Sequence, residues 1–135
     1  MKGLDTSVLL ALLEGDPGSK DFLRRLRGEE VATTEANLLE LEYLAVRGPG
    51  RHRGARKEAV ARLRRKITVL PIDERAVEAC SHRLGKGAEA VPPLVGAMMG
   101  ALEAAGCEEL LTHDPPPKMG KWKVRISRIQ FHHTK

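Results

Sequence analysis

Aromatic residues are scarce in this chain of 135 residues, where Phe, Trp and Tyr together contribute 3% of the sequence. Any core must therefore be built from aliphatic side chains, and the hydrophobic share of 41% is typical of a globular protein. Cysteine occurs only at positions 80 and 107, which suits neither a disulfide framework nor a zinc site and indicates a reducing compartment. The length fits one domain, with little room for a second.

Long apolar runs are missing as well. No run approaches the roughly 18 apolar residues of a membrane-spanning helix, so we expect no membrane segment. Asp5 interrupts the first apolar stretch, and Glu14 and Asp16 end it, which argues against a signal peptide. These features together predict a cytoplasmic protein.

Basic residues exceed acidic residues modestly, 23 against 18, and give a net charge of +5. The excess is concentrated in residues 51–66, where the only acid is Glu58. A basic stripe of this kind is a candidate surface for RNA phosphates, although a solvated helix face explains the pattern equally well. The predicted RNA contacts are Arg51, Arg53, Arg56 and Lys57.

Strand and helix patterns alternate along the chain. Short strands are expected at residues 2–5, 30–33, 67–70, 109–112 and 122–126. Helical patterns separate them, at residues 8–13, 19–27, 38–45, 53–65, 74–84 and 93–105. This alternation predicts an α/β fold whose central parallel sheet of four or five strands is covered by helices on both faces. We expect one domain over residues 1–126 and a C-terminal tail over residues 127–135.

Three carboxylates stand where such a fold binds ligands. Asp5 and Asp114 each fall at the carboxyl end of a predicted strand, where the ligand crevice of a parallel sheet lies. Glu40 lies near Leu44, on or beside the apolar face of a predicted helix, and buried carboxylates require partners. Three converging carboxylates repel one another unless a hard cation such as Mg²⁺ or Mn²⁺ binds between them. A metal in that position can activate water to attack a phosphodiester.

Each of these residues also has a simpler explanation. Asp5 can cap the helix that follows it, and Asp114 can be a turn residue before a proline. Thr112 can hold a metal ligand or a bound water in place, or it can be an ordinary strand threonine. His113 stands beside Asp114 and could approach a substrate.

Three segments of the sequence resemble the PIN domain family. The opening, residues 3–10 (Gly-Leu-Asp-Thr-Ser-Val-Leu-Leu), looks like the first strand and helix of PIN domains. Residues 32–34 (Ala-Thr-Thr) and 37–41 (Asn-Leu-Leu-Glu-Leu) are similar to their second strand and glutamate-bearing helix. Residues 106–114 resemble their fourth strand with its Thr-x-Asp ending. Within the family, the chain is most similar to the single-domain VapC-type toxins.

The resemblance implies a three-layer α/β/α fold in which the first and fourth strands lie side by side. It implies endoribonuclease activity that depends on Mg²⁺ or Mn²⁺. Asp5, Glu40 and Asp114 match the family's first, second and last acidic positions. The resemblance also implies a homodimer and, in the toxin subfamily, an antitoxin protein as partner.

One feature of the family is missing. PIN domains usually carry another Asp at the start of the helix before the fourth strand, whereas residues 90–100 contain no acid here. A residue between positions 92 and 95 stands in its place. Two hypotheses follow. The first is that the chain is a metal-dependent endoribonuclease, such as the toxin of a toxin-antitoxin pair. The second is that it is a catalytically impaired PIN-like module that binds nucleic acid or protein.

Overall fold

The computed structural model describes residues 1–47, 53–115 and 120–131. Five parallel strands form one sheet in the order β3-β2-β1-β4-β5. Their bounds are β1 Lys2–Leu4, β2 Val31–Thr34, β3 Thr68–Leu70, β4 Glu109–Thr112 and β5 Arg125–Arg128. The first and fourth strands are direct neighbours, as the resemblance implied, and the prediction of a central parallel sheet is confirmed.

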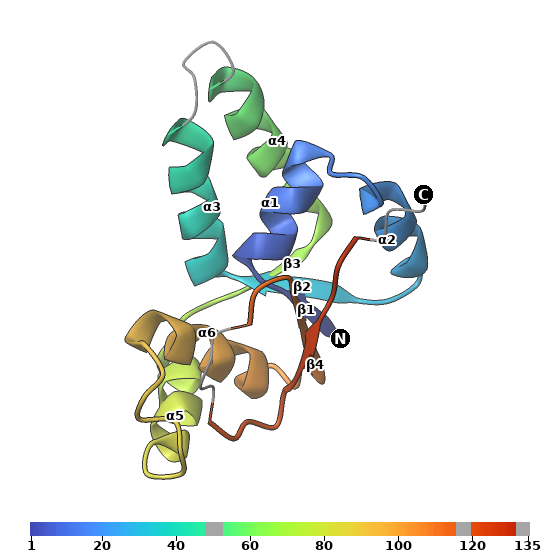
Figure 1. Cartoon of the computed structure of the whole chain (residues 1–135). Helices are drawn as coiled ribbons and strands as arrows, with labels where there is room; N and C mark the ends of the chain where they lie inside the picture. Colours follow the sequence, from blue (N-terminus) through green and yellow to red (C-terminus); the bar gives the residue numbers. More distant parts are fainter. Residues whose placement is uncertain (48–52, 116–119, 132–135) are drawn as a thin grey trace.

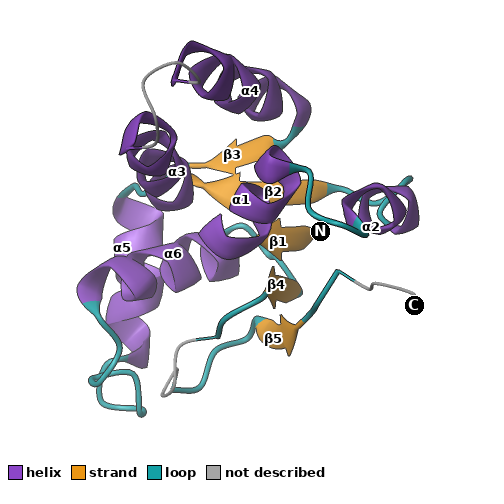
Figure 2. Cartoon of the chain, turned by 45° about the horizontal axis from the view of Figure 1, so that its top comes forward, coloured by secondary structure: helices purple, strands orange, loops and turns teal. Residues whose placement is uncertain are grey.

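Helices cover both faces of the sheet and complete the three layers (Figures 1 and 2). On one face lie α1 Thr6–Glu14, α2 Ser19–Arg25, α3 Glu35–Arg47 and α4 Arg53–Lys66. On the other lie α5 Glu74–Arg83 and α6 Pro93–Ala104. The α/β/α fold class predicted from the sequence is therefore confirmed. Among the described residues, no helix is both long enough and apolar enough to cross a membrane.

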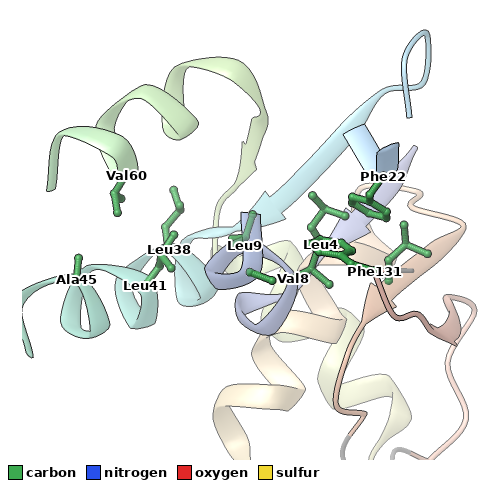
Figure 3. Close-up of a cluster of buried hydrophobic side chains, with 11 residues drawn as sticks. Leu4, Val8, Leu9, Phe22, Leu38, Leu41, Ala45, Val60 and Phe131 are labelled. Carbon is green, nitrogen blue, oxygen red and sulfur yellow. The ribbon is translucent and has the colours of Figure 1, made fainter. Parts of the chain in front are cut away.

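The strand residues divide between two apolar cores because successive side chains of a strand point to opposite faces. Leu4 and Leu111 are register partners, and both belong to the core beneath α1, α3 and α4 (Figure 3). Leu110, one residue away, belongs with Ala32 to the core beneath α5 and α6. Both cores are mainly aliphatic, as the scarcity of aromatic residues required.

Helices α5 and α6 pack unusually close together, and a glycine makes this approach possible. A Cβ atom added to Gly100 would lie 2.2 Å from the backbone oxygen of Ala76. No side chain fits that space, so only glycine permits this close contact between α6 and α5.

The chain stays ordered in the fold beyond the expected domain boundary. The last strand was expected at residues 122–126, but β5 spans Arg125–Arg128, so the boundary drawn after residue 126 falls inside it. The Ile129 amide then donates to the Thr112 carbonyl at 2.8 Å, and Phe131 is buried in the first core. This happens because β5 pairs with β4 up to the last residue of β4, and the chain that follows β5 then passes over α2.

Candidate active site

Asp5 follows the last residue of β1 and its carboxylate is held from three directions. It is the N-cap of α1, where Oδ1 accepts a hydrogen bond from the Val8 amide at 3.2 Å. The Ser7 hydroxyl donates to the same oxygen at 2.6 Å. The Thr112 hydroxyl donates to Oδ2. The capping explanation for Asp5 is therefore correct, and it does not compete with a functional one, because the carboxylate still lies at the carboxyl edge of the sheet.

The backbone of Asp114 is linked to the Asp5 carboxylate by hydrogen bonds to the same threonine. The Thr112 hydroxyl accepts a hydrogen bond from the Asp114 amide at 3.1 Å while it donates to Asp5. The Asp114 side chain is exposed, and it forms no hydrogen bond or ion pair in the parts of the chain that the structure describes. Thr112 thus orients one carboxylate and the backbone of the other.

Ser7 is a site residue that the sequence analysis did not select. Its hydroxyl donates to Asp5 and accepts from the His113 amide at 3.0 Å, so it joins the start of α1 to the loop after β4. The available signal was its position two residues after Asp5. Ser and Thr are frequent there in helix starts, and the pattern alone does not separate a capping role from a bridging one.

Glu40, Asp5 and Asp114 do not form a metal-binding group of three in this structure. Among residues 1–47, 53–115 and 120–131, no group of three or more His, Cys, Asp or Glu side chains could hold a metal ion. The placement of Glu40 on or beside the apolar face was also wrong, because the residue is exposed. Leu38, Leu41 and Ala45 form the buried stripe of α3, and this stripe turns Glu40 toward solvent.

A buried polar cluster fixes where α3 begins. The Thr34 hydroxyl donates to Asn37 Oδ1 at 2.7 Å, and Asn37 Nδ2 donates to the Thr6 hydroxyl at 3.1 Å. The same nitrogen lies 3.3 Å from the sulfur of Met98 on α6. Each buried side-chain oxygen and nitrogen of the cluster thereby has a partner, which such buried groups require. The cluster ties the starts of α1 and α3 to α6, close to the carboxyl edge of the sheet.

The range 92–95, where the family's acid is missing, lies at the start of α6. Pro92, Pro93 and Leu94 are exposed at the start of α6, whereas Val95 is half-buried against the second core. Val95 precedes Met98 by three residues, so the two side chains share one face of the helix. All four side chains in the range 92–95 are apolar, so none of them can supply the missing carboxylate.

The basic stripe is only partly available to a ligand. Arg53 and Lys57 are exposed on α4, but Arg56 donates from Nε to the Ala45 carbonyl of α3 at 2.6 Å. That bond satisfies a carbonyl near the end of α3 and holds the two helices together. Arg51 lies outside the described residues. The α3–α4 pair projects away from the sheet, and α4 begins at its outer end (Figure 1), so the start of the stripe is not beside Asp5.

Asp5 and Asp114 have the chemistry that a hard divalent cation requires. Both are carboxylates at adjacent strand ends, and Asp114 has no competing partner among the described residues. Oδ2 of Asp5 accepts one protein hydrogen bond and keeps a lone pair. Mg²⁺ is commonly held by one or two carboxylates together with water and substrate phosphate. The pair therefore fits such an ion without Glu40.

The structure resembles solved toxin-antitoxin proteins over nearly its whole length. It matches VapBC2 of Rickettsia felis, bound to a DNA fragment from its promoter, with a TM-score of 0.75 and 11% identity over 96% of this chain and 98% of that one. The DNA-bound VapBC of Salmonella typhimurium gives 0.73 and 18%, over 94% and 96% of the two chains. VapC20 of Mycobacterium tuberculosis, a toxin that cleaves the sarcin-ricin loop, gives 0.62 and 21%, over 84% and 90%.

Sequence comparison places the chain in a family. No curated protein matches it. The PIN domain model, however, matches residues 3–88, which run from β1 past α5 and include Asp5 and Glu40. Because that match spans more than half of the chain, and the fold agrees with it, the chain belongs to the PIN domain family.

Proposed function

We propose that this protein is an endoribonuclease that depends on Mg²⁺ or Mn²⁺, and that it acts as the toxin of a toxin-antitoxin pair in the cytoplasm. The observation that carries the proposal is the pair of aspartates at the ends of β1 and β4, joined through Thr112. Membership of the PIN domain family and the likeness to VapC-type structures support it.

The chain's own residues would prepare this site before substrate arrives. Asp5 and Asp114 would hold the metal, which when bound would activate water and offset charge on the phosphate. Ser7 and Thr112 fix the Asp5 carboxylate by hydroxyl donation, so little ordering remains to be done on binding. We also propose Glu40 as an acid of this site. It is exposed on α3, so metal or substrate can reach it from solvent.

The test is cleavage of a mixed pool of single-stranded RNA with Mg²⁺ or Mn²⁺, compared for the parent, Asp5→Asn and Asp114→Asn. Asn caps helices as well as Asp does, so the first variant should fold while it loses negative charge at the metal position. Asp21→Asn is the matched control, because Asp21 is an exposed acid of α2 that forms an ion pair with Arg24 of the same helix. Cleavage that persists in both site variants would refute the proposal.

A second candidate function is favoured by Val95. An apolar, half-buried side chain stands in the range where the family usually has an acid. A centre with fewer carboxylates binds hard cations less tightly, since affinity follows the number of charged ligands. The alternative is therefore an impaired PIN-like module that binds RNA or protein without cutting. Absence of metal-dependent cleavage by the parent, together with retained RNA binding, would favour this alternative.

An apolar groove suits the proposed antitoxin. The groove has a volume of about 450 Å³ and lies between α1, α2 and α4, with Leu12, Leu26 and Leu63 in its wall. The groove is also lined by two bases, Arg62 and Lys66, and by one acid, Glu29, and this basic excess favours a partner segment that carries both apolar and acidic side chains. The Rickettsia felis complex is bound to DNA from its own promoter, so the product of the gene beside this one is the partner to test. That product should inhibit the parent but not Leu63→Arg.

Two further surfaces support proposed contacts. Leu39 and Tyr43 are four residues apart on α3 and 58% and 59% exposed, which suits the homodimer that the resemblance implied. Sedimentation of the parent and of Tyr43→Arg tests that assignment.

Arg53 and Lys57 are proposed to hold RNA at its phosphates. Their joint replacement by Ala should weaken RNA binding and reduce its dependence on salt, and an unchanged salt slope would leave the stripe as a solvated face.

A further inference from the structure

We propose that a cavity beside Asp114 binds one nucleobase of the RNA substrate and prefers guanine. The inference rests on the proposed function and adds a base-reading subsite to it. The cavity has a volume of about 340 Å³ and is lined by Asp16, Pro17, His113, Gln130 and Phe131. One of its walls, His113, is the residue next to Asp114 in the chain, so a base held there would belong to a nucleotide at or beside the phosphate that is cut.

One wall of the cavity is held rigidly by contacts with the core. His113 Nδ1 lies 2.7 Å from the Ile129 carbonyl, and it must carry the hydrogen because a carbonyl oxygen only accepts. The His113 ring stands edge-on to Phe131, with ring centroids 4.7 Å apart. Phe131 in turn packs on Phe22 of α2 at 4.9 Å (Figure 3). These contacts fix the His113 ring and leave Nε2 as the nitrogen available to a ligand.

Another wall is a short, well-anchored loop between α1 and α2. The Asp16 amide donates to the Ala11 carbonyl at 3.0 Å, and the Asp16 carbonyl accepts from the Ser19 amide at 3.0 Å. Pro17 has a fixed φ, which further limits the loop. The Asp16 carboxylate itself is exposed and forms no hydrogen bond or ion pair within the described parts of the chain. Its backbone is thus fixed while its side chain is left unused.

The polar groups of the cavity suit a base and not a phosphate. The Asp16 carboxylate would repel a phosphate, whereas it can accept two hydrogen bonds from neighbouring N–H groups. Guanine offers such a pair on its Watson–Crick edge, at N1 and the exocyclic N2. Gln130 and His113 supply further donors and acceptors for the remaining edge. Unpaired bases of single-stranded RNA are commonly bound in this way, with their edges read by side chains beside aromatic or histidine rings.

The experiment measures binding and cleavage separately. RNA octamers of uridine with one central A, C, G or U are titrated against the protein in EDTA, where anisotropy reports binding without metal-dependent cleavage. The same octamers are then incubated with Mn²⁺ and their cleavage products are mapped. The variants are Asp16→Asn and His113→Ala, with Asp21→Asn as the matched control because it removes an acid of α2 that does not line the cavity.

The parent should bind the octamer with guanine about tenfold more tightly than the uridine octamer, as a bidentate base contact supplies. Asp16→Asn should remove that preference, so that the guanine and uridine octamers bind with equal affinity, while Asp21→Asn should keep the preference. Equal affinity of the parent for all four octamers would overturn the base pocket, even if cleavage is strong. A guanine preference in EDTA without any cleavage in Mn²⁺ would instead support the pocket and refute the proposed nuclease.

Discussion

Glu109 provides a quantitative test of how the sheet is held together at the end opposite the aspartates. It is the first residue of β4, and its register partners Lys2 and Arg125 are the corresponding residues of β1 and β5. Lys2 Nζ donates to its carboxylate at 2.7 Å, the Ser127 hydroxyl also donates to it, and Arg125 pairs with it at 3.1 Å. The Lys2 and Ser127 hydrogen bonds, followed by that from Arg125, lower the Glu109 pKa from 4.5 to about 2.

The sign of the effect follows from the lower pKa in the folded state. Stability from Glu109 is fully present above pH 4.5 and is lost as the pH falls toward 2, because the unfolded chain takes up the proton first. The difference between those pKa values corresponds to about 3 kcal/mol. Because Arg125 is mostly exposed and screened by solvent, we expect about 2 kcal/mol in practice. Hydrogen bonding to Glu109 likewise raises the Lys2 pKa, and this describes the same ion pair.

The assay is urea unfolding of the parent, Glu109→Gln and Glu108→Gln at pH 7 and pH 3. Glu109→Gln should lower the free energy of unfolding by about 2 kcal/mol at pH 7 and by clearly less at pH 3. Glu108 is the matched control, since its 3.3 Å pair with the N-terminal amine leaves its side chain 64% exposed. It should contribute about 0–1 kcal/mol. Equal losses for the two variants, or a Glu109→Gln loss that does not depend on pH, would show that the network does not stabilise the sheet.

Three further predictions concern the site and the packing that supports it. Thr112→Val should lower metal affinity or cleavage by about 10–100-fold, measured by Mn²⁺ calorimetry and initial rates, with little change in RNA affinity in EDTA. Val95→Asp should raise Mn²⁺ affinity and cleavage by roughly tenfold, and unchanged values of both would place the missing acid elsewhere. Gly100→Ala should destabilise the fold by about 1–3 kcal/mol in urea, whereas Gly54→Ala, in an exposed stretch of α4 with no atom near the added Cβ, should be neutral or stabilising.

The sequence was sufficient to predict the parallel sheet and to place Asp5 and Asp114 after strands that end at the same edge of it. Both residues follow a strand, and in a parallel sheet the carboxyl ends of the strands share one edge. The adjacency of the first and fourth strands came from the resemblance to PIN domains, because strand order depends on contacts distant in sequence. Local patterns also located the helix ends at Gly15 and near Gly106.

The features that the sequence did not predict depend on contacts between distant segments. Ser7 bonds to the His113 amide, and Asn37 reaches Thr6 and Met98. Nothing local marks these polar residues as buried or bridging. Glu40 was misplaced for a different reason: its helix has leucines on several sides, so the pattern did not define which stripe is buried. Contact with α1 and α4 selects the stripe that contains Leu41.

The acid content of the site has a consequence for the protein without metal. Carboxylates that converge without a cation raise one another's pKa and destabilise the folded state. Because residues 92–95 are all apolar, this chain gathers fewer negative charges at the carboxyl edge of its sheet than a PIN domain with four acids. Hydroxyl and amide donors already satisfy Asp5. The protein should therefore fold fully in EDTA and gain little thermal stability from Mn²⁺. An acid restored at position 95 should reverse both properties, because it adds repulsion without metal and a ligand with it.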